Sequence, residues 1–265
     1  VGYFSLSYEN GHGKNTALGF KTLAVQDAGA DAYNIAIGHN TGLNVSTGVQ
    51  NTLVGGNAGD ALTSGGYNVA LGYNALSAED DGSYNTAIGR GTLQNQDAGN
   101  AYNTAVGYNA GTNVTTGVTS VIMGGLAGAA LTSGSDNIVI GYAALSTEDT
   151  RGRNIAIGTL ALSSQNSAAD AYNVAIGYTA GTAMTTGVEN VLIGGLAGDA
   201  LTTGHRNTVL GTYALSTEDT GGRNTAIGFR TLETLDVGAD GYNVAVGYNT
   251  GQAMTTGVNN TLMGS

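Results

Sequence analysis

The stretch Asn103-Thr104-Ala105-Val106-Gly107-Tyr108-Asn109-Ala110-Gly111 holds one copy of a motif that recurs throughout the chain. The motif reads Asn-x-x-aliphatic-Gly, and a new copy begins every 17 to 19 residues. A fixed period of this length is the signature of a repeat architecture, in which each unit stacks on the next. The copies begin at Asn15, Asn34, Asn51, Asn68, Asn85, Asn103, Ser120, Asn137, Asn154, Asn173, Asn190, Asn207, Asn224, Asn243 and Asn260.

The repeats are grouped, because the longer interval returns at every fourth copy. This gives a second period of 69 to 70 residues, with blocks at 15–84, 85–153 and 154–223 and a partial block at 224–265. We interpret residues 1–265 as one continuous repeat array, since a solenoid grows in one dimension and has no natural domain size. The chain starts and stops inside the motif, which predicts that it is a segment of a longer polypeptide.

The composition favours strands and excludes two other repetitive classes. Glycine accounts for 45 of 265 residues while proline is absent, which argues against collagen. The apolar fraction is 41%, enough to form a core, and β-branched residues are prominent. There is no cysteine, and therefore no disulfide framework or thiolate metal site.

Each copy of the motif is expected to form one coil of an all-β, parallel β-solenoid of about fifteen coils. Alternate side chains of a strand point to opposite faces. We expect the aliphatic fourth position, such as Val106, to face the core, and Gly107 to turn a corner where positive φ or close backbone approach is needed. A short second strand should follow. The motif asparagine either bonds to its copies in neighbouring coils or opens an Asx turn.

Both faces of the motif strand are apolar. Thr, Val or Ile at position two shares a face with the aliphatic at position four, and the usual Ala at position three points the other way. A strand that is apolar on both sides is usually covered on both sides. The second strand of the coil can cover one face and a neighbouring chain the other, which favours a homotrimer; a monomeric solenoid is the alternative.

A volume exchange marks one coil in four. Ala105 occurs with an aromatic Tyr108 after the motif glycine, whereas Leu53 occurs with Gly56. Because protein interiors are densely packed, this pattern predicts that the two positions share one layer. A shared duplication history would give the same pattern.

The stretches Asn85-Thr86-Ala87-Ile88-Gly89 and Asn68-Val69-Ala70-Leu71-Gly72-Tyr73-Asn74-Ala75-Leu76 resemble two related repeat groups. One is the β-roll of trimeric autotransporter adhesin heads. The other is the repeat region of phage tail fibres that end in an endosialidase-type chaperone. The resemblance implies a parallel β-roll or β-helix, trimeric assembly, surface exposure and attachment. The longer coil and the four-coil block depart from the adhesin heads.

The longest loop of each block carries two acidic or amide side chains around small residues, a pattern that can supply oxygen ligands to Ca²⁺. An ordinary solvated Asx turn is the alternative, and no other cofactor is indicated. The candidate ligands are Asp27, Asp31, Asp97, Asn100, Asn166, Asp170, Asp236 and Asp240.

Two further features recur once per block. The acidic segments 77–81, 146–150 and 216–220, with Lys14, Arg153 and Arg223 nearby, are expected at the surface, where they favour solubility. A tyrosine precedes the motif asparagine at 33, 102, 172 and 242. We expect these rings to pack beneath the long loops; stacking on sugars or on a partner is the alternative.

Nothing in the sequence indicates an enzyme. His12, His39 and His205 occupy unrelated places in their coils, and no catalytic motif lies in its required context. The net charge of −11 argues against nucleic acid and anionic membranes as partners, and no apolar run is long enough for a transmembrane helix.

The sequence therefore predicts a structural or adhesive segment of an extracellular, cell-surface or virion fibre. Its expected partner is the chain itself, and a surface glycan or receptor is a further candidate. Two alternatives stay open: a subunit of a self-assembling extracellular filament, and a glycan-binding or glycan-cleaving β-helix.

Overall fold

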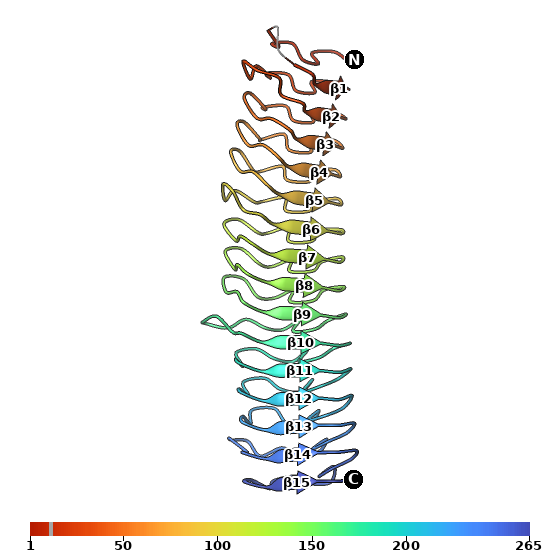
Figure 1. Ribbon diagram of the computed structural model, residues 1–265, viewed down its shortest axis with the longest axis vertical. Coiled ribbons are helices and arrows are strands. Elements are labelled where there is room, and N and C mark those ends of the chain that lie inside the picture. The colour runs from red at the N-terminus through yellow and green to blue at the C-terminus, as the bar shows by residue number, and fades with distance from the viewer. Residues whose placement is uncertain (11–12) are drawn as a thin grey trace. The chain divides into compact units, whose positions relative to one another are not determined.

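The computed structural model describes residues 1–10 and 13–265, which form two compact units, Val1–Ser135 and Asp136–Ser265. Each unit is a stack of coils, and each coil contributes one strand of three residues (Figure 1). The first unit contains β1 (Thr16–Leu18), β2 (Ile35–Ile37), β3 (Thr52–Val54), β4 (Val69–Leu71), β5 (Thr86–Ile88), β6 (Thr104–Val106) and β7 (Val121–Met123). The second contains β8 (Ile138–Ile140), β9 (Ile155–Ile157), β10 (Val174–Ile176), β11 (Val191–Ile193), β12 (Thr208–Leu210), β13 (Thr225–Ile227), β14 (Val244–Val246) and β15 (Thr261–Met263).

Within each unit the strands are parallel and consecutive, and equivalent motif positions face each other. In β5 and β6, for example, Ala87 lies opposite Ala105 and Ile88 opposite Val106. The expected all-β parallel solenoid is thus confirmed, and the described residues contain no helix. Because the register never slips, each motif position forms a column that runs along the unit.

The expected second strand is wrong, since each coil of the described chain has a single strand. After the motif glycine the backbone enters left-handed conformations, as at Asn109 (φ 52°) and Gly111 (φ 57°), which interrupt an extended segment. The turns still bond from coil to coil: the Asn109 amide donates to the Arg90 carbonyl at 2.9 Å.

The motif asparagine forms a ladder between coils, which confirms the first of the two interpretations. The Asn51 amide N–H donates to Oδ1 of Asn34 at 2.8 Å, and Nδ2 of Asn51 donates to the carbonyl of Gly65 at 2.8 Å. These side chains are buried, so their polar groups need such partners.

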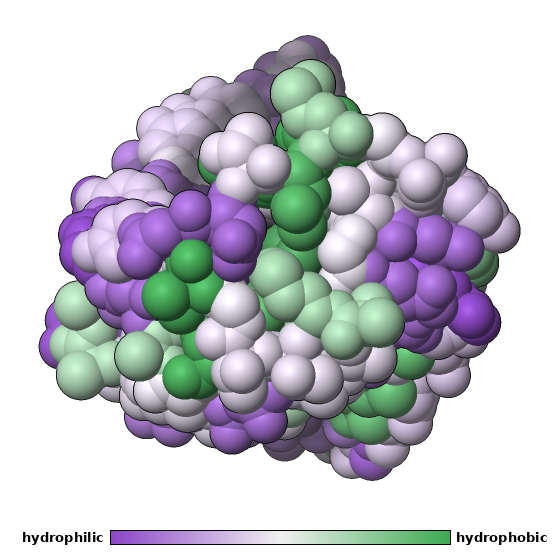
Figure 2. All heavy atoms as spheres, turned by 90° about the horizontal axis from the view of Figure 1, so that it is seen from below, coloured by the Kyte–Doolittle hydropathy of each residue, from purple (hydrophilic) through white to green (hydrophobic). Residues whose placement is uncertain are grey.

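The face assignment of the strand was wrong. The third position, not the fourth, points into the coil: Ala105 is fully buried, whereas Leu18 at a fourth position is 51% exposed. The reason is the phase that the asparagine sets. With position one inside, alternation puts position three inside and positions two and four outside. Figure 2 looks onto the C-terminal end, where hydrophobic residues lie in the middle of the end face and also reach parts of its edge.

The motif glycine forms the corner that the sequence predicts. Gly107 has φ 133°, and a Cβ atom there would lie 2.7 Å from the carbonyl oxygen of Gly124 in the next coil. Both the positive φ and the close approach exclude a side chain.

The predicted sharing of one layer by the third position and the residue after the motif glycine is wrong. Tyr108 is 52% exposed and shares no layer with the buried Ala105. Leu53 instead fills the space beside Gly59, the ninth position, where a Cβ atom would lie 3.0 Å from Cδ2 of Leu53. In the coil of Asn85 the ninth position is the buried Leu93, and the third is a small Ala.

Candidate interaction face

The outward positions two and four of the strands form an uncharged face on each unit, here called the outer face. In the first unit it consists of Thr16, Leu18, Ile35, Ile37, Thr52, Val54, Val69, Leu71, Thr86, Ile88, Thr104, Val106, Val121 and Met123. In the second it consists of Ile138, Ile140, Ile155, Ile157, Val174, Ile176, Val191, Ile193, Thr208, Leu210, Thr225, Ile227, Val244, Val246, Thr261 and Met263. Sheets with one solvated face normally carry polar residues there.

The outer face is open to water. In the first unit five of its fourteen side chains are exposed, including Ile35, Ile88 and Met123, and the other nine are partly exposed. These side chains follow one another from coil to coil without a charge between them, and contiguous exposed apolar patches on a protein surface commonly mark interaction sites. Such a patch indicates an interaction surface.

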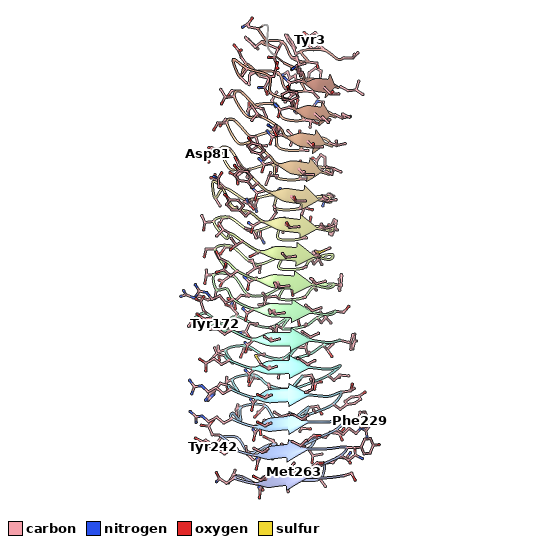
Figure 3. All side chains as sticks on the ribbon, viewed as in Figure 1. Tyr3, Asp81, Tyr172, Phe229, Tyr242 and Met263 are labelled. Atoms are coloured by element: carbon pink, nitrogen blue, oxygen red, sulfur yellow. The ribbon has the colours of Figure 1, made fainter. Side chains whose placement is uncertain are left out.

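An aromatic row borders the outer face at the C-terminal ends of the strands, in the residues just after the motif glycine. We call it the C-terminal rim. In the first unit Tyr3 stacks on Phe20 and Phe20 on His39, with centroids 5.7 and 5.1 Å apart. Further along, Cζ of Arg90 lies 6.0 Å from the Tyr73 ring and 5.5 Å from the Tyr108 ring. In the second unit Phe229 stacks on Tyr248 and lies on this side of the strands (Figure 3).

The opposite border, the N-terminal rim, consists of the residues just before the motif asparagine and the loop leading to them. Figure 3 shows Asp81, Tyr172 and Tyr242 on this side of the strands. Side chains of neighbouring coils contact each other along this rim in one of two arrangements. In one, a cation pairs with an aspartate of the next coil and with the tyrosine beside it. These sets are Lys14–Asp31–Tyr33, Arg153–Asp170–Tyr172 and Arg223–Asp240–Tyr242.

The other arrangement replaces the cation with a ring. Tyr84 occupies the place of the cation and stacks on Tyr67 and Tyr102, with centroids 5.2 and 5.0 Å apart. The corresponding acid is then the neutral Asn100. The expectation that the rim tyrosines pack beneath the long loops is wrong: Tyr102 is 55% exposed, and the equivalent rings are similarly open.

The predicted calcium ligands of each loop contact different partners. Asp31, Asp170 and Asp240 pair with cations of the preceding coil, and Asp27 accepts a hydrogen bond from Nδ2 of Asn10 at 3.4 Å. Asp97 and Asp236 lie near buried glutamates instead, and Asn100 and Asn166 stay candidates that no observed acidic group includes or tests.

Within the described residues, two acidic groups are close enough to share an ion, Glu79–Asp80–Asp81 and Glu218–Asp219–Asp236. Of the residues in these two groups, Asp236 is the one that the sequence predicts as a calcium ligand. Calcium binding by these loops stays a prediction, which chelator-dependent melting would test.

The acidic segments are not wholly at the surface as expected, because their glutamates Glu79, Glu148 and Glu218 are fully buried. Oε1 of Glu218 accepts the Gly221 amide at 2.7 Å, and Oε2 accepts the Val237 amide of the next coil at 3.0 Å. Burial raises the pKa of the Glu218 carboxyl. These glutamates tie each long loop to the preceding coil, a role that sequence analysis missed; their fixed spacing from the next asparagine was the available signal.

The two described histidines, His39 and His205, do not form a shared site. His39 belongs to the C-terminal rim, whereas Nε2 of His205 lies 3.6 Å from Asp240 at the N-terminal rim. His12 lies outside the described residues. That the chain is not an enzyme stays a prediction.

No family model matches the chain, and neither a curated protein nor a solved structure matches it. The class is therefore defined by the fold itself, a repeat protein of the parallel β-solenoid type with an apolar outer face on each unit. A search of the described residues for a helix able to cross a membrane finds none.

Proposed function

We propose that the chain is a structural segment of an extracellular or virion fibre in which copies associate side by side through their outer faces. The observation that carries this proposal is the outer face, two aliphatic or threonine columns without a charge. Covering such a surface is favourable at about 25 cal/mol per Å², although part of this gain is offset by the cost of association.

The repeat spacing makes a second copy a suitable occupant. Parallel strands lie about 4.8 Å apart, so the columns of two copies have the same period and can interdigitate over their full length. In the first unit the outer face extends over seven strands, from β1 to β7. A homotrimer around a common axis, as the resemblance to adhesin heads and tail fibres implies, would cover all three outer faces.

The stiffness that a fibre needs has two sources within the coil. The asparagine ladder links each coil to the next through buried hydrogen bonds, as between Asn51 and Asn34. The motif glycines allow the backbones of neighbouring coils to touch at the corner, as at Gly107. The chain would act as a rigid spacer or head that presents a binding function, at a cell or virion surface.

Light scattering on the purified chain tests the proposal. We expect a mass three times that of the 26.4 kDa chain. Val106→Asp places a charge in the outer face and should give a folded monomer by circular dichroism, and Thr104→Lys serves as a second variant. The matched control Thr116→Asp, at an exposed loop position, should stay trimeric.

A wild-type monomer at micromolar concentration would contradict the proposal. Polymers of open-ended length would instead favour the filament alternative, because a heterologous contact that does not close produces a fibre.

A further inference from the structure

Arg90 stands apart from most of the cations of the chain. None of the ion pairs between described residues includes it, whereas Lys14, Arg153, Arg206, Arg223 and Arg230 each have a carboxylate partner. In a chain with net charge −11, an exposed guanidinium without an acid beside it requires an explanation.

The side chain of Arg90 is held in place on the C-terminal rim, two residues after the end of β5. It lies between the rings of Tyr73 and Tyr108, and Nη1 donates to the hydroxyl of Tyr108 at 3.4 Å. Arg90 is exposed. Because the rings restrict its rotamers, less side-chain entropy is lost when the guanidinium forms an ion pair.

The opposite rim has the complementary charge in the coil just before that of Arg90. Asp80 and Asp81 are exposed in the loop that leads into β5, and Asp81 lies on the N-terminal side of the strands (Figure 3). None of the described ion pairs includes either aspartate. The rim residue of this coil is Tyr84, whereas the equivalent coils of other blocks have a cation. The N-terminal rim is therefore acidic here, and the C-terminal rim is basic.

A cyclic assembly brings these two rims together. When copies surround an axis parallel to the stack with their outer faces inward, the C-terminal rim of each copy meets the N-terminal rim of the next, as in any heterologous ring contact. A second copy of the chain is thus the partner that would supply the missing acid to Arg90 and the missing cation to Asp80 and Asp81.

We propose that Arg90 of one copy binds the Asp80–Asp81 pair of the neighbouring copy and thereby fixes the register between copies. This inference rests on the proposed assembly. The outer face repeats at every coil, so a slide of about 4.8 Å leaves its apolar contacts nearly unchanged. An Arg–carboxylate contact, which occurs once in the first unit, distinguishes the correct register from the others, because opposite charges meet in only one of them.

Cysteine cross-linking tests the contact directly, since the chain contains no cysteine of its own. With a short bismaleimide cross-linker we expect the double variant Arg90→Cys/Asp81→Cys to give covalent trimers on a denaturing gel, because an Arg–carboxylate pair holds its Cα atoms farther apart than the roughly 7 Å that a direct disulfide allows. Each single variant should run as a monomer. The control Arg90→Cys/Asp27→Cys keeps two thiols but moves one of them three coils away, roughly 14 Å along the stack. It should not cross-link.

A charge exchange gives an independent measurement by analytical ultracentrifugation. We expect Arg90→Asp to raise the trimer dissociation constant on the order of tenfold, since three exposed pairs are lost per trimer. Asp81→Arg should act in the same direction. The double exchange Arg90→Asp/Asp81→Arg should recover most of the loss, and high salt should reduce the effect of each single variant.

The outcomes separate this inference from the proposed function. Trimers that form no cross-link through residues 90 and 81 would overturn the register contact and leave the fibre assembly standing. Equal cross-linking of the Asp27→Cys control would also overturn it, because the register would then not be fixed. A wild-type monomer would overturn both.

Discussion

The motif asparagine determines the orientation of the strand that follows it. Its amide is buried and bonded to two neighbouring turns, as when Nδ2 of Asn103 donates to the Gly117 carbonyl at 2.7 Å and to Oε1 of Gln96 at 2.9 Å. With this side chain inside, the third position must also face inward. The exposed outer face is therefore a consequence of the ladder.

Asn103→Ala tests the ladder at a single residue. The change leaves the Gly117 carbonyl, Oε1 of Gln96 and the Ser120 amide without this partner. We expect the free energy of unfolding to fall by about 1–3 kcal/mol in urea denaturation. The exposed Asn95→Ala, a matched control, should change it by less than about 0.5 kcal/mol. Equal effects would show that the ladder adds nothing to stability.

The buried glutamates make stability depend on pH. Burial raises the pKa of Glu218 above its ordinary value of 4.5, so the folded chain binds this proton more tightly than the unfolded chain. Its contribution to stability is complete below pH 4.5 and is lost as the pH rises through the folded pKa. Glu218→Gln should remove this part of the slope in urea midpoints, and the exposed Asp27→Asn, which is not among the groups that shift Glu218, should keep it. A slope unchanged by Glu218→Gln would contradict the assignment.

At the scale of the element, the coil interior is filled by alternative combinations of the same positions. Leu53 with Gly59 occupies one coil, and Ala87 with Leu93 occupies another. Both ninth positions have positive φ, 55° at Gly59 and 47° at Leu93, so the backbone accepts either residue.

A double-mutant cycle tests this exchange. Leu53→Ala should lower the free energy of unfolding by about 2–5 kcal/mol through the cavity it leaves. Gly59→Leu alone should cost about 1–3 kcal/mol through overpacking. The double variant should be more stable than the sum of the two by at least about 1 kcal/mol, because the new leucine occupies the vacated space. Additive losses in thermal or urea unfolding would refute the exchange.

The repeat period predicts the coil, but it does not predict which face of the strand is buried. The spacing of the asparagines gives one strand and one glycine corner per coil, and both are present. A strand with Val at position two, Ala at three and Leu at four, such as β4, is apolar on both faces, so hydropathy alone cannot tell which face is inside. The burial of the asparagine decides which face is inside. The sequence does not reveal that burial, because asparagine is mostly an exposed residue.

The sites that sequence analysis missed depend on contacts between coils. Glu79, Glu148 and Glu218 lie in acidic segments that look solvated, yet each one is buried because backbone amides of its own turn and the next coil surround it. The ion pair between Arg223 and Asp240 joins residues 17 positions apart, one coil from the next. Such pairs can be predicted only when the exact number of residues in each coil is known.

Whether the chain works alone or in an assembly depends on whether its outer face is covered. Each unit has a sheet that a globular protein would protect with a second layer of its own chain. Association of copies would provide that layer, and the associated chains would form a segment of a fibre. The rim charges would then select one register among many that the apolar columns allow.

Thiol reactivity at the outer face measures this coverage most directly. Ile88→Cys places a single thiol at the centre of the outer face of the first unit, where the native side chain is 37% exposed on the isolated chain. Thr116→Cys places one on an exposed loop as the reference. At concentrations where the chain is assembled, we predict that a maleimide reacts with the thiol at residue 88 at least about tenfold more slowly, because the neighbouring copies exclude it. Equal rates at the two positions would contradict the account, since the outer face would then be open to water.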